Sequence, residues 1–156
     1  MARSIFPSNK FYSIANATLA ESFLNLKQLD SASFYIKRAG LEAPQRKNKA
    51  RYLFITGQLF ESLGKRDSAE WAFKEIIALK RKAPKKFLLQ AQIKKTLLDT
   101  SNLITDRVSF LQKILKNYEN QTFEHLVNRA IGNLYLKQKE DSLALVYFDR
   151  SIDSPY

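Results

Sequence analysis

Apolar residues recur at helical spacing in several segments of the chain, and short polar turns separate these segments. Within residues 50–84, one apolar stripe covers 52–63 and a second covers 69–77, with Gly64 between them. Positions three and four apart share one face of an α-helix, so each stripe predicts an amphipathic helix. The glycine between them predicts a turn. This stretch therefore predicts two helices joined as a hairpin.

Similar helix pairs are predicted along the rest of the chain. The tripeptide Asp-Ser-Ala opens a second helix at residues 30–32 and again at 67–69, which sets a step of 37 residues. A set of small and aromatic residues also occurs twice with the same internal spacing: Gly57, Phe60, Ala69 and Phe73, then Gly132, Tyr135, Ala144 and Phe148. The pair between these two lacks the set, so we expect a degenerate third repeat. The predicted repeats span about 10–44, 47–84, 85–117 and 121–153, after an extended leader over 1–9.

The order of small and aromatic residues around Gly64 resembles the tetratricopeptide repeat, a helix–turn–helix unit of about 34 residues. This resemblance implies an all-α fold, a right-handed superhelical solenoid of about four repeats within a single domain over 10–153. It also implies a concave groove, lined by the first helix of each pair, that binds a peptide or partner protein. We expect the arginines in the groove to bind carboxylates, and Phe54 and Leu136 to be apolar anchors. The groove residues in this frame are Glu21, Leu24, Arg51, Phe54, Gln58, Glu61, Arg129, Asn133 and Leu136.

A narrower resemblance covers roughly residues 32–152. The stretch KARYLFITGQLFESLGKRDSAEWAFKEII, then a degenerate pair and a closing repeat, is similar to the repeat region of PorW/SprE-like lipoproteins of Bacteroidetes type IX secretion and gliding. This chain has Ala83-Pro84-Lys85 where that family has a Pro-Pro-Tyr-like junction, and it lacks the cysteine that would carry a lipid. The resemblance implies a fragment that holds secretion components together at the periplasmic face of the outer membrane. A complete chain would instead be cytoplasmic, so the compartment stays unknown.

The chain has a net charge of +11, and its basic residues are concentrated at two junctions between repeats. Such junctions lie on one edge of a helical solenoid, so these residues are expected to form a basic edge. They are either solvated loops or a surface for an acidic partner, with single-stranded nucleic acid the less favoured ligand. The basic edge comprises Arg46, Lys47, Lys49, Lys80, Arg81, Lys82, Lys85 and Lys86.

The sequence offers no constellation for catalysis, a metal or a cofactor. It has no cysteine, and His125 is its single histidine, so a zinc-type ligand set cannot be assembled. No apolar run is long enough for a transmembrane segment. We therefore expect a non-enzymatic scaffold that binds a protein or peptide of acidic character, without cofactors. The alternative is a cytoplasmic regulatory module whose basic edge contacts nucleic acid or a signalling partner.

Overall fold

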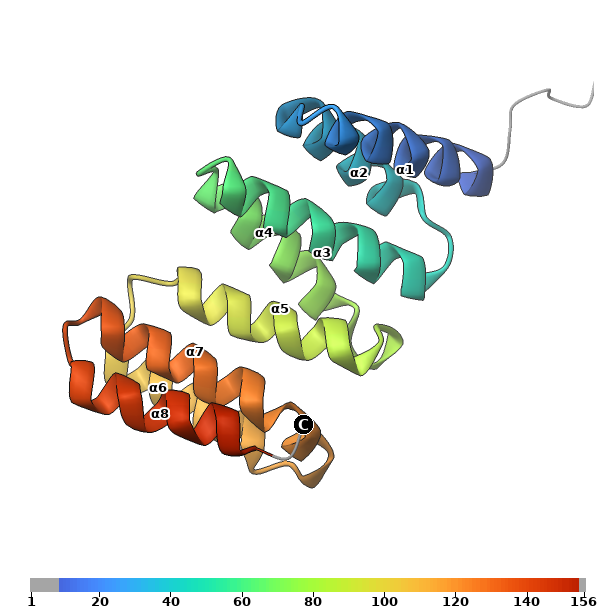
Figure 1. The fold of residues 1–156 in the computed structure, drawn as a ribbon. Helices are drawn as coiled ribbons and strands as arrows, with labels where there is room; N and C mark the ends of the chain where they lie inside the picture. Colours follow the sequence, from blue (N-terminus) through green and yellow to red (C-terminus); the bar gives the residue numbers. More distant parts are fainter. Residues whose placement is uncertain (1–8, 155–156) are drawn as a thin grey trace, which may run out of the picture. The chain divides into compact units, whose positions relative to one another are not determined.

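The computed structural model describes residues 9–154, which fold into eight α-helices and two 3-10 helices without a β-strand (Figure 1). The helices are α1 (Asn9–Asn25), α2 (Leu29–Glu42), α3 (Arg46–Ser62), α4 (Arg66–Ala78), η1 (Lys80–Lys82), α5 (Lys85–Leu98), α6 (Ile104–Leu115), η2 (Tyr118–Phe123), α7 (Glu124–Lys137) and α8 (Asp141–Asp153). The expected all-α fold is confirmed. No helix in the described range is both long and apolar enough to cross a membrane. The predicted leader lies outside the described residues except for Asn9, which begins α1.

The chain divides into two compact units, an N-terminal unit that ends at Gln92 and a C-terminal unit that begins at Ile93. The division falls within the range of α5, so this helix supplies residues to both units. The single domain expected over residues 10–153 stays a prediction, because compactness alone does not measure folding cooperativity.

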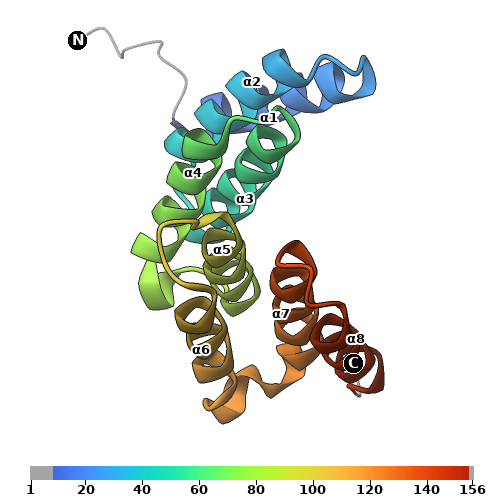
Figure 2. The same ribbon diagram turned by 90° about the vertical axis from the view of Figure 1, so that its left-hand side faces the viewer.

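Consecutive helices of the N-terminal unit pack on one another from α1 through α4 (Figure 2). Ala20 of α1 and Ala32 and Ala39 of α2 are almost completely buried, and their small side chains allow the two helices to approach closely. Leu59 of α3 completes the same cluster, together with Ile36 of α2. The first two helix pairs therefore share one hydrophobic core.

Gly57 marks the crossing of α3 and α4. A methyl group at this position would lie 2.5 Å from the ring of Phe73, which is completely buried on α4. Ala69, also completely buried, lies one helical turn before Phe73. In this pair the small residues of the recurring set therefore lie where the two helices cross, with Gly57 against the aromatic ring.

The C-terminal unit repeats this crossing between α7 and α8. A methyl group at Gly132 would lie 2.6 Å from the ring of Phe148, and Ala144 is buried as Ala69 is. Helix α6 packs on α7 and contributes the fully buried Leu111. The first helix of this pair was expected from about Gln121, but the chain forms the 3-10 helix η2 before α7 begins at Glu124.

Three of the helix pairs are closed by the same turn. Lys27, Gly64 and Lys139 have φ values of 58°, 68° and 62°, and each is followed two residues later by the first residue of the next helix. In each case the residue after it donates a backbone hydrogen bond to the carbonyl five residues back, as from Lys65 to Phe60 at 2.8 Å. This pattern is the Schellman motif, in which a left-handed residue ends the helix.

The pair α5–α6 is closed by a different and longer turn. Five residues separate Leu98 from Ile104, compared with three in each of the other pairs. The carboxylate of Asp99 holds this turn by accepting hydrogen bonds from the backbone N–H and hydroxyl of Ser101, at 2.9 and 2.7 Å. The third repeat, predicted to be degenerate, thus also differs from the other pairs in the length and hydrogen bonding of its turn.

Candidate functional site

The first helices of the N-terminal unit present polar side chains next to the shared core. Glu21 on α1 and Arg51 and Gln58 on α3 are exposed. Leu24 and Glu61 are half-buried, and Leu24 packs against the core cluster to which both helices contribute. We call Glu21, Leu24, Arg51, Gln58 and Glu61 the α1–α3 face.

Phe54 was predicted to be an anchor for a partner, and the structure contradicts this. Its side chain is only 9% exposed. The ring centroid lies 5.8 Å from that of Phe73 and 5.8 Å from that of Phe87. Phe54 therefore belongs to an aromatic cluster inside the N-terminal unit and offers little surface to a ligand.

The C-terminal unit carries the last three predicted groove residues on α7. Arg129 is exposed, Leu136 is 50% exposed and Asn133 is half-buried. Their spacing of four and then three residues places them on one side of the helix. Leu136 is thus accessible as an apolar contact, with Arg129 two turns before it.

Residues of the basic edge come together at a pocket of the N-terminal unit. Arg46, the first residue of α3, and Lys80, Arg81 and Lys82 of η1 line a cavity of about 500 Å³. All four are exposed, and Ala78 and Leu79 complete the lining. The other members of the basic edge do not line this cavity: Lys47 and Lys86 are exposed, and Lys49 and Lys85 are half-buried.

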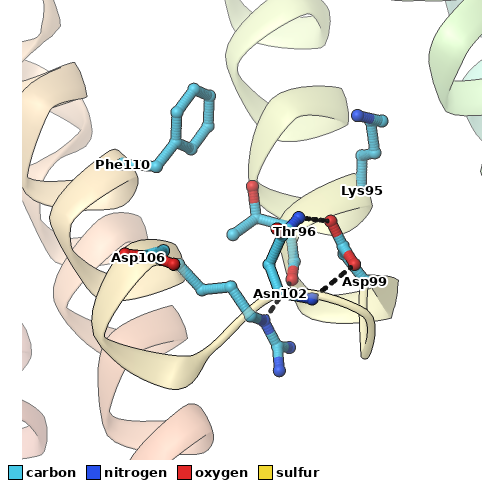
Figure 3. Close-up of a pocket in the computed structure, with 7 residues that line it drawn as sticks. Lys95, Thr96, Asp99, Asn102, Asp106 and Phe110 are labelled. Atoms are coloured by element: carbon cyan, nitrogen blue, oxygen red, sulfur yellow. Dashed lines mark hydrogen bonds between the residues drawn. The ribbon is translucent and has the colours of Figure 1, made fainter.

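A second cavity, of about 380 Å³, lies in the C-terminal unit beside the turn between α5 and α6 (Figure 3). Asn102 donates a hydrogen bond from its side chain to the Asp99 carboxylate at 2.7 Å. The hydrogen bonds from Ser101, with those from Asn102, lower the pKa of Asp99 well below its ordinary value. Arg107 donates hydrogen bonds to the backbone carbonyls of Thr96 and Leu97 at 2.9 and 3.0 Å. Its guanidinium therefore caps the C-terminal end of α5.

This cavity is the feature that sequence reasoning missed. Residues 100–102 indicate a turn, but the partners of Arg107 lie ten and eleven residues earlier in the chain. The cavity is also lined by Lys95, Asp106 and Phe110. Its best-placed polar groups, on Asp99 and Arg107, are used within the protein, which favours a structural role for them.

The described residues contain no group of three or more histidine, cysteine or acidic side chains that could hold a metal ion. His125 is half-buried, and its Nδ1 atom is buried without a hydrogen-bond partner. Its backbone carbonyl accepts a hydrogen bond from the Ser151 hydroxyl at 2.7 Å, which ties α7 to α8. The residue is placed for packing between these two helices.

No protein-family model matches the chain, and no curated protein is significantly similar to it. Its fold is similar to that of known structures, among them the crystal structure of MamA, a tetratricopeptide-like protein. That similarity has a TM-score of 0.61 over 91% of this chain and 77% of MamA, at 16% sequence identity. At this identity the comparison establishes the fold alone. The chain thus has a tetratricopeptide-like fold of helix pairs, as expected.

Proposed function

We propose that this protein is a non-enzymatic scaffold that binds a partner protein or peptide through the first helices of its helix pairs. The observation that carries the proposal is the tetratricopeptide-like fold shared with MamA. A helix-pair array of this kind offers an extended binding surface. Among the described residues no group of three or more histidine, cysteine or acidic side chains could hold a metal ion, and the sequence has no cysteine.

The α1–α3 face and the exposed side of α7 are the proposed contact surfaces. Arg51 and Arg129 are long, exposed cations suited to charge-assisted hydrogen bonds with carboxylates. Leu136, half exposed, supplies an apolar contact on α7. Phe54 is removed from the proposed site because it packs inside the N-terminal unit.

The test compares two variants that each lose one positive charge. Arg51→Ala alters the α1–α3 face, and Lys74→Ala alters the exposed side of the second helix α4. Proteins captured from the source cells by the wild-type chain are identified, and their affinities are measured by calorimetry. We expect Arg51→Ala to weaken binding and Lys74→Ala to leave it unchanged, with equal melting temperatures. Equal affinities of all three chains would contradict the proposed surface.

Phe54→Ala provides an internal check on the corrected site. Because this ring is buried between two others, its truncation is expected to cost about 3–5 kcal/mol of stability. Any loss of binding in this variant should therefore follow its loss of folded protein. A stable Phe54→Ala variant with weakened binding would restore Phe54 to the contact surface.

We further propose a narrower role as an assembly component of the type IX secretion system. It rests only on the resemblance of residues 32–152 to the repeat region of PorW/SprE-like lipoproteins noted in the sequence, to which the comparisons with known proteins add nothing. Capture of secretion components that depends on Arg51 would support this role. Capture of other proteins alone would leave the scaffold proposal standing and remove the secretion role.

A further inference from the structure

We propose that the pocket lined by Arg46, Lys80, Arg81 and Lys82 binds a segment of the partner protein that is rich in aspartate and glutamate. We call it the basic pocket. This inference rests on the proposed function, because it assigns a chemistry to part of the partner. It concerns a different surface from the α1–α3 face, so each can be tested without the other.

The basic pocket is built from two parts of the N-terminal unit that are far apart in sequence. Arg46 begins α3, whereas Lys80, Arg81 and Lys82 form η1 after the end of α4. Lys80 has a φ of 52°, a left-handed conformation that is unfavourable for a residue other than glycine. The chain therefore maintains an unfavourable backbone conformation at the point where three consecutive cations enter the pocket wall.

The charge of the basic pocket is not balanced by the protein. No acidic residue belongs to its lining. Within residues 9–154, the four cationic side chains form no ion pair or side-chain hydrogen bond, although Arg38, Lys65 and Lys74 each pair with a carboxylate elsewhere. Cations held around one cavity repel one another, and an anion placed among them removes this cost.

The start of α3 adds a second reason to expect an anion. Arg46 and Lys47 occupy the first turn of this helix, which contains no acidic residue. The preceding residue, Gln45, makes no side-chain cap hydrogen bond. A helix N-terminus carries a partial positive charge and favours carboxylates, so cations there are the opposite of the stabilising arrangement. A carboxylate from a partner would compensate both the helix end and the side chains.

The lining favours an acidic peptide over single-stranded nucleic acid. Proteins that bind single strands stack the bases on aromatic side chains, and no aromatic residue lines the basic pocket. Its uncharged residues are the aliphatic Ala78 and Leu79, which suit the methylene groups of glutamate and the apolar residues beside it. The two arginines can each bind a carboxylate through two parallel hydrogen bonds.

The test uses a fluorescein-labelled peptide of alternating glutamate and aspartate as the probe, with the glutamine–asparagine peptide as its neutral counterpart. Fluorescence anisotropy measures binding to the full chain, to the pocket variant Arg46→Gln/Lys80→Gln/Lys82→Gln, and to the control variant Lys113→Gln/Lys116→Gln/Lys139→Gln. Both variants lose three positive charges from exposed positions. Circular dichroism confirms that each is folded.

We expect the pocket variant to lose about tenfold or more of its affinity for the acidic peptide, and the control variant to lose far less. Equal losses in both variants would show that only the net charge attracts the peptide and would overturn the proposal. Tighter pocket-dependent binding of an oligothymidine of matched charge would overturn it in favour of nucleic acid.

The results for the two surfaces separate the proposals. If Arg51→Ala weakens partner binding and the pocket variant does not weaken peptide binding, the basic pocket alone fails. If the pocket binds the acidic peptide while Arg51→Ala changes nothing, the proposed α1–α3 contact fails and the basic pocket stands.

Discussion

At the scale of single residues, Gly57 and Gly132 determine how closely two helix pairs can pack. Gly57→Ala would place a methyl group 2.5 Å from the ring of Phe73, which is fully buried, so that the ring or the helix would have to shift. Alanine gains up to about 1 kcal/mol in helix propensity, but overpacking costs about 1–3 kcal/mol. We expect a net loss of stability, measured as a lower denaturant midpoint.

Gly40→Ala is the matched control for this prediction. It makes the same change within a helix, but its methyl group would lie 3.2 Å from the side chain of Leu53, a longer distance than the 2.5 Å at Gly57. Its midpoint should be closer to the wild-type value than that of Gly57→Ala. If Gly57→Ala were as stable as Gly40→Ala, the close crossing of α3 and α4 would be wrong.

Asp99 makes stability depend on pH. Hydrogen bonds from Ser101 and then Asn102 lower its pKa in the folded protein, whereas in the unfolded chain the pKa of an aspartate is about 3.9. The folded state therefore gains stability above pH of about 4, and this gain is lost as the pH falls further. We expect the melting temperature of Asp99→Asn to fall less than that of the wild type on acidification.

Asp149→Asn serves as the comparison because it removes one carboxylate from an exposed position of α8. Melting temperatures of the three chains are compared between neutral pH and about pH 2. At this lower pH an aspartate with an ordinary pKa is protonated in both the folded and the unfolded chain. Equal acid sensitivity of Asp99→Asn and the wild type would contradict a stabilising role for the hydrogen bonds of Asp99.

Single residues also show which contacts can be predicted from the sequence and which cannot. The recurring set found in the sequence contains Gly57 and Phe73, which pack on each other in the structure, and both belong to one hairpin at a fixed spacing. The repeat frame misplaces Phe54, which packs against Phe73 of its own hairpin and also against Phe87, a residue 33 positions later on another hairpin. Helical periodicity within one segment carries no information about such a neighbour.

At the scale of the structural element, the recurring turn gives a test of backbone conformation. Lys27 and Lys139 adopt the left-handed conformation that Gly64 also adopts. Glycine has no penalty there, and other residues lose about 1–2 kcal/mol. We expect Lys27→Gly and Lys139→Gly each to raise the free energy of unfolding by about 1 kcal/mol, measured by chemical denaturation.

Two further variants test whether conformation is the cause. Gly64→Ala should lower stability, although its methyl group would meet no atom within 4 Å. Lys116→Gly makes the same lysine-to-glycine change at a residue whose φ is −63°, and should not raise the free energy of unfolding. A gain in Lys116→Gly equal to that in Lys139→Gly would assign the effect to lost charge.

The starts of the helices were less predictable than their ends. Asp30, Asp67 and Thr105 belong to the residue types that favour the N-cap, yet each lies inside the first turn of its helix. The residues at the caps are Gln28, Lys65 and Leu103, which make no side-chain cap hydrogen bond. Before α2 and α4 the Schellman turn fixes where the helix begins, and before α6 the turn held by Asp99 does so, so the position of the polar residue does not decide it.

At the scale of the whole molecule, the expected single domain can be tested by unfolding. Trp71, the single tryptophan, lies on α4 with the Lys37 ammonium 4.6 Å from its ring centroid, and so reports on the N-terminal unit. Circular dichroism reports on the helices of both units. We expect the two denaturation curves to coincide, because α5 contributes to both units and neighbouring repeats stabilise one another.

A tryptophan transition at a different denaturant concentration would show that the units unfold separately. In that case the chain would have two domains, and stabilities measured by either probe alone would apply to one unit. Coincident curves would allow a single free energy of unfolding to be assigned to every variant described above.

The turn shared by residues 26–28, 63–65 and 138–140 also bears on how such a chain can be rearranged. Each of these three turns ends one helix and leads into the next with the same left-handed residue and the same backbone hydrogen bond, so one turn could replace another. A recombination event within one of them would leave both flanking helices in frame and intact. A crossover between two such turns would exchange the second helix of one pair together with the first helix of the next, and would leave each helix whole.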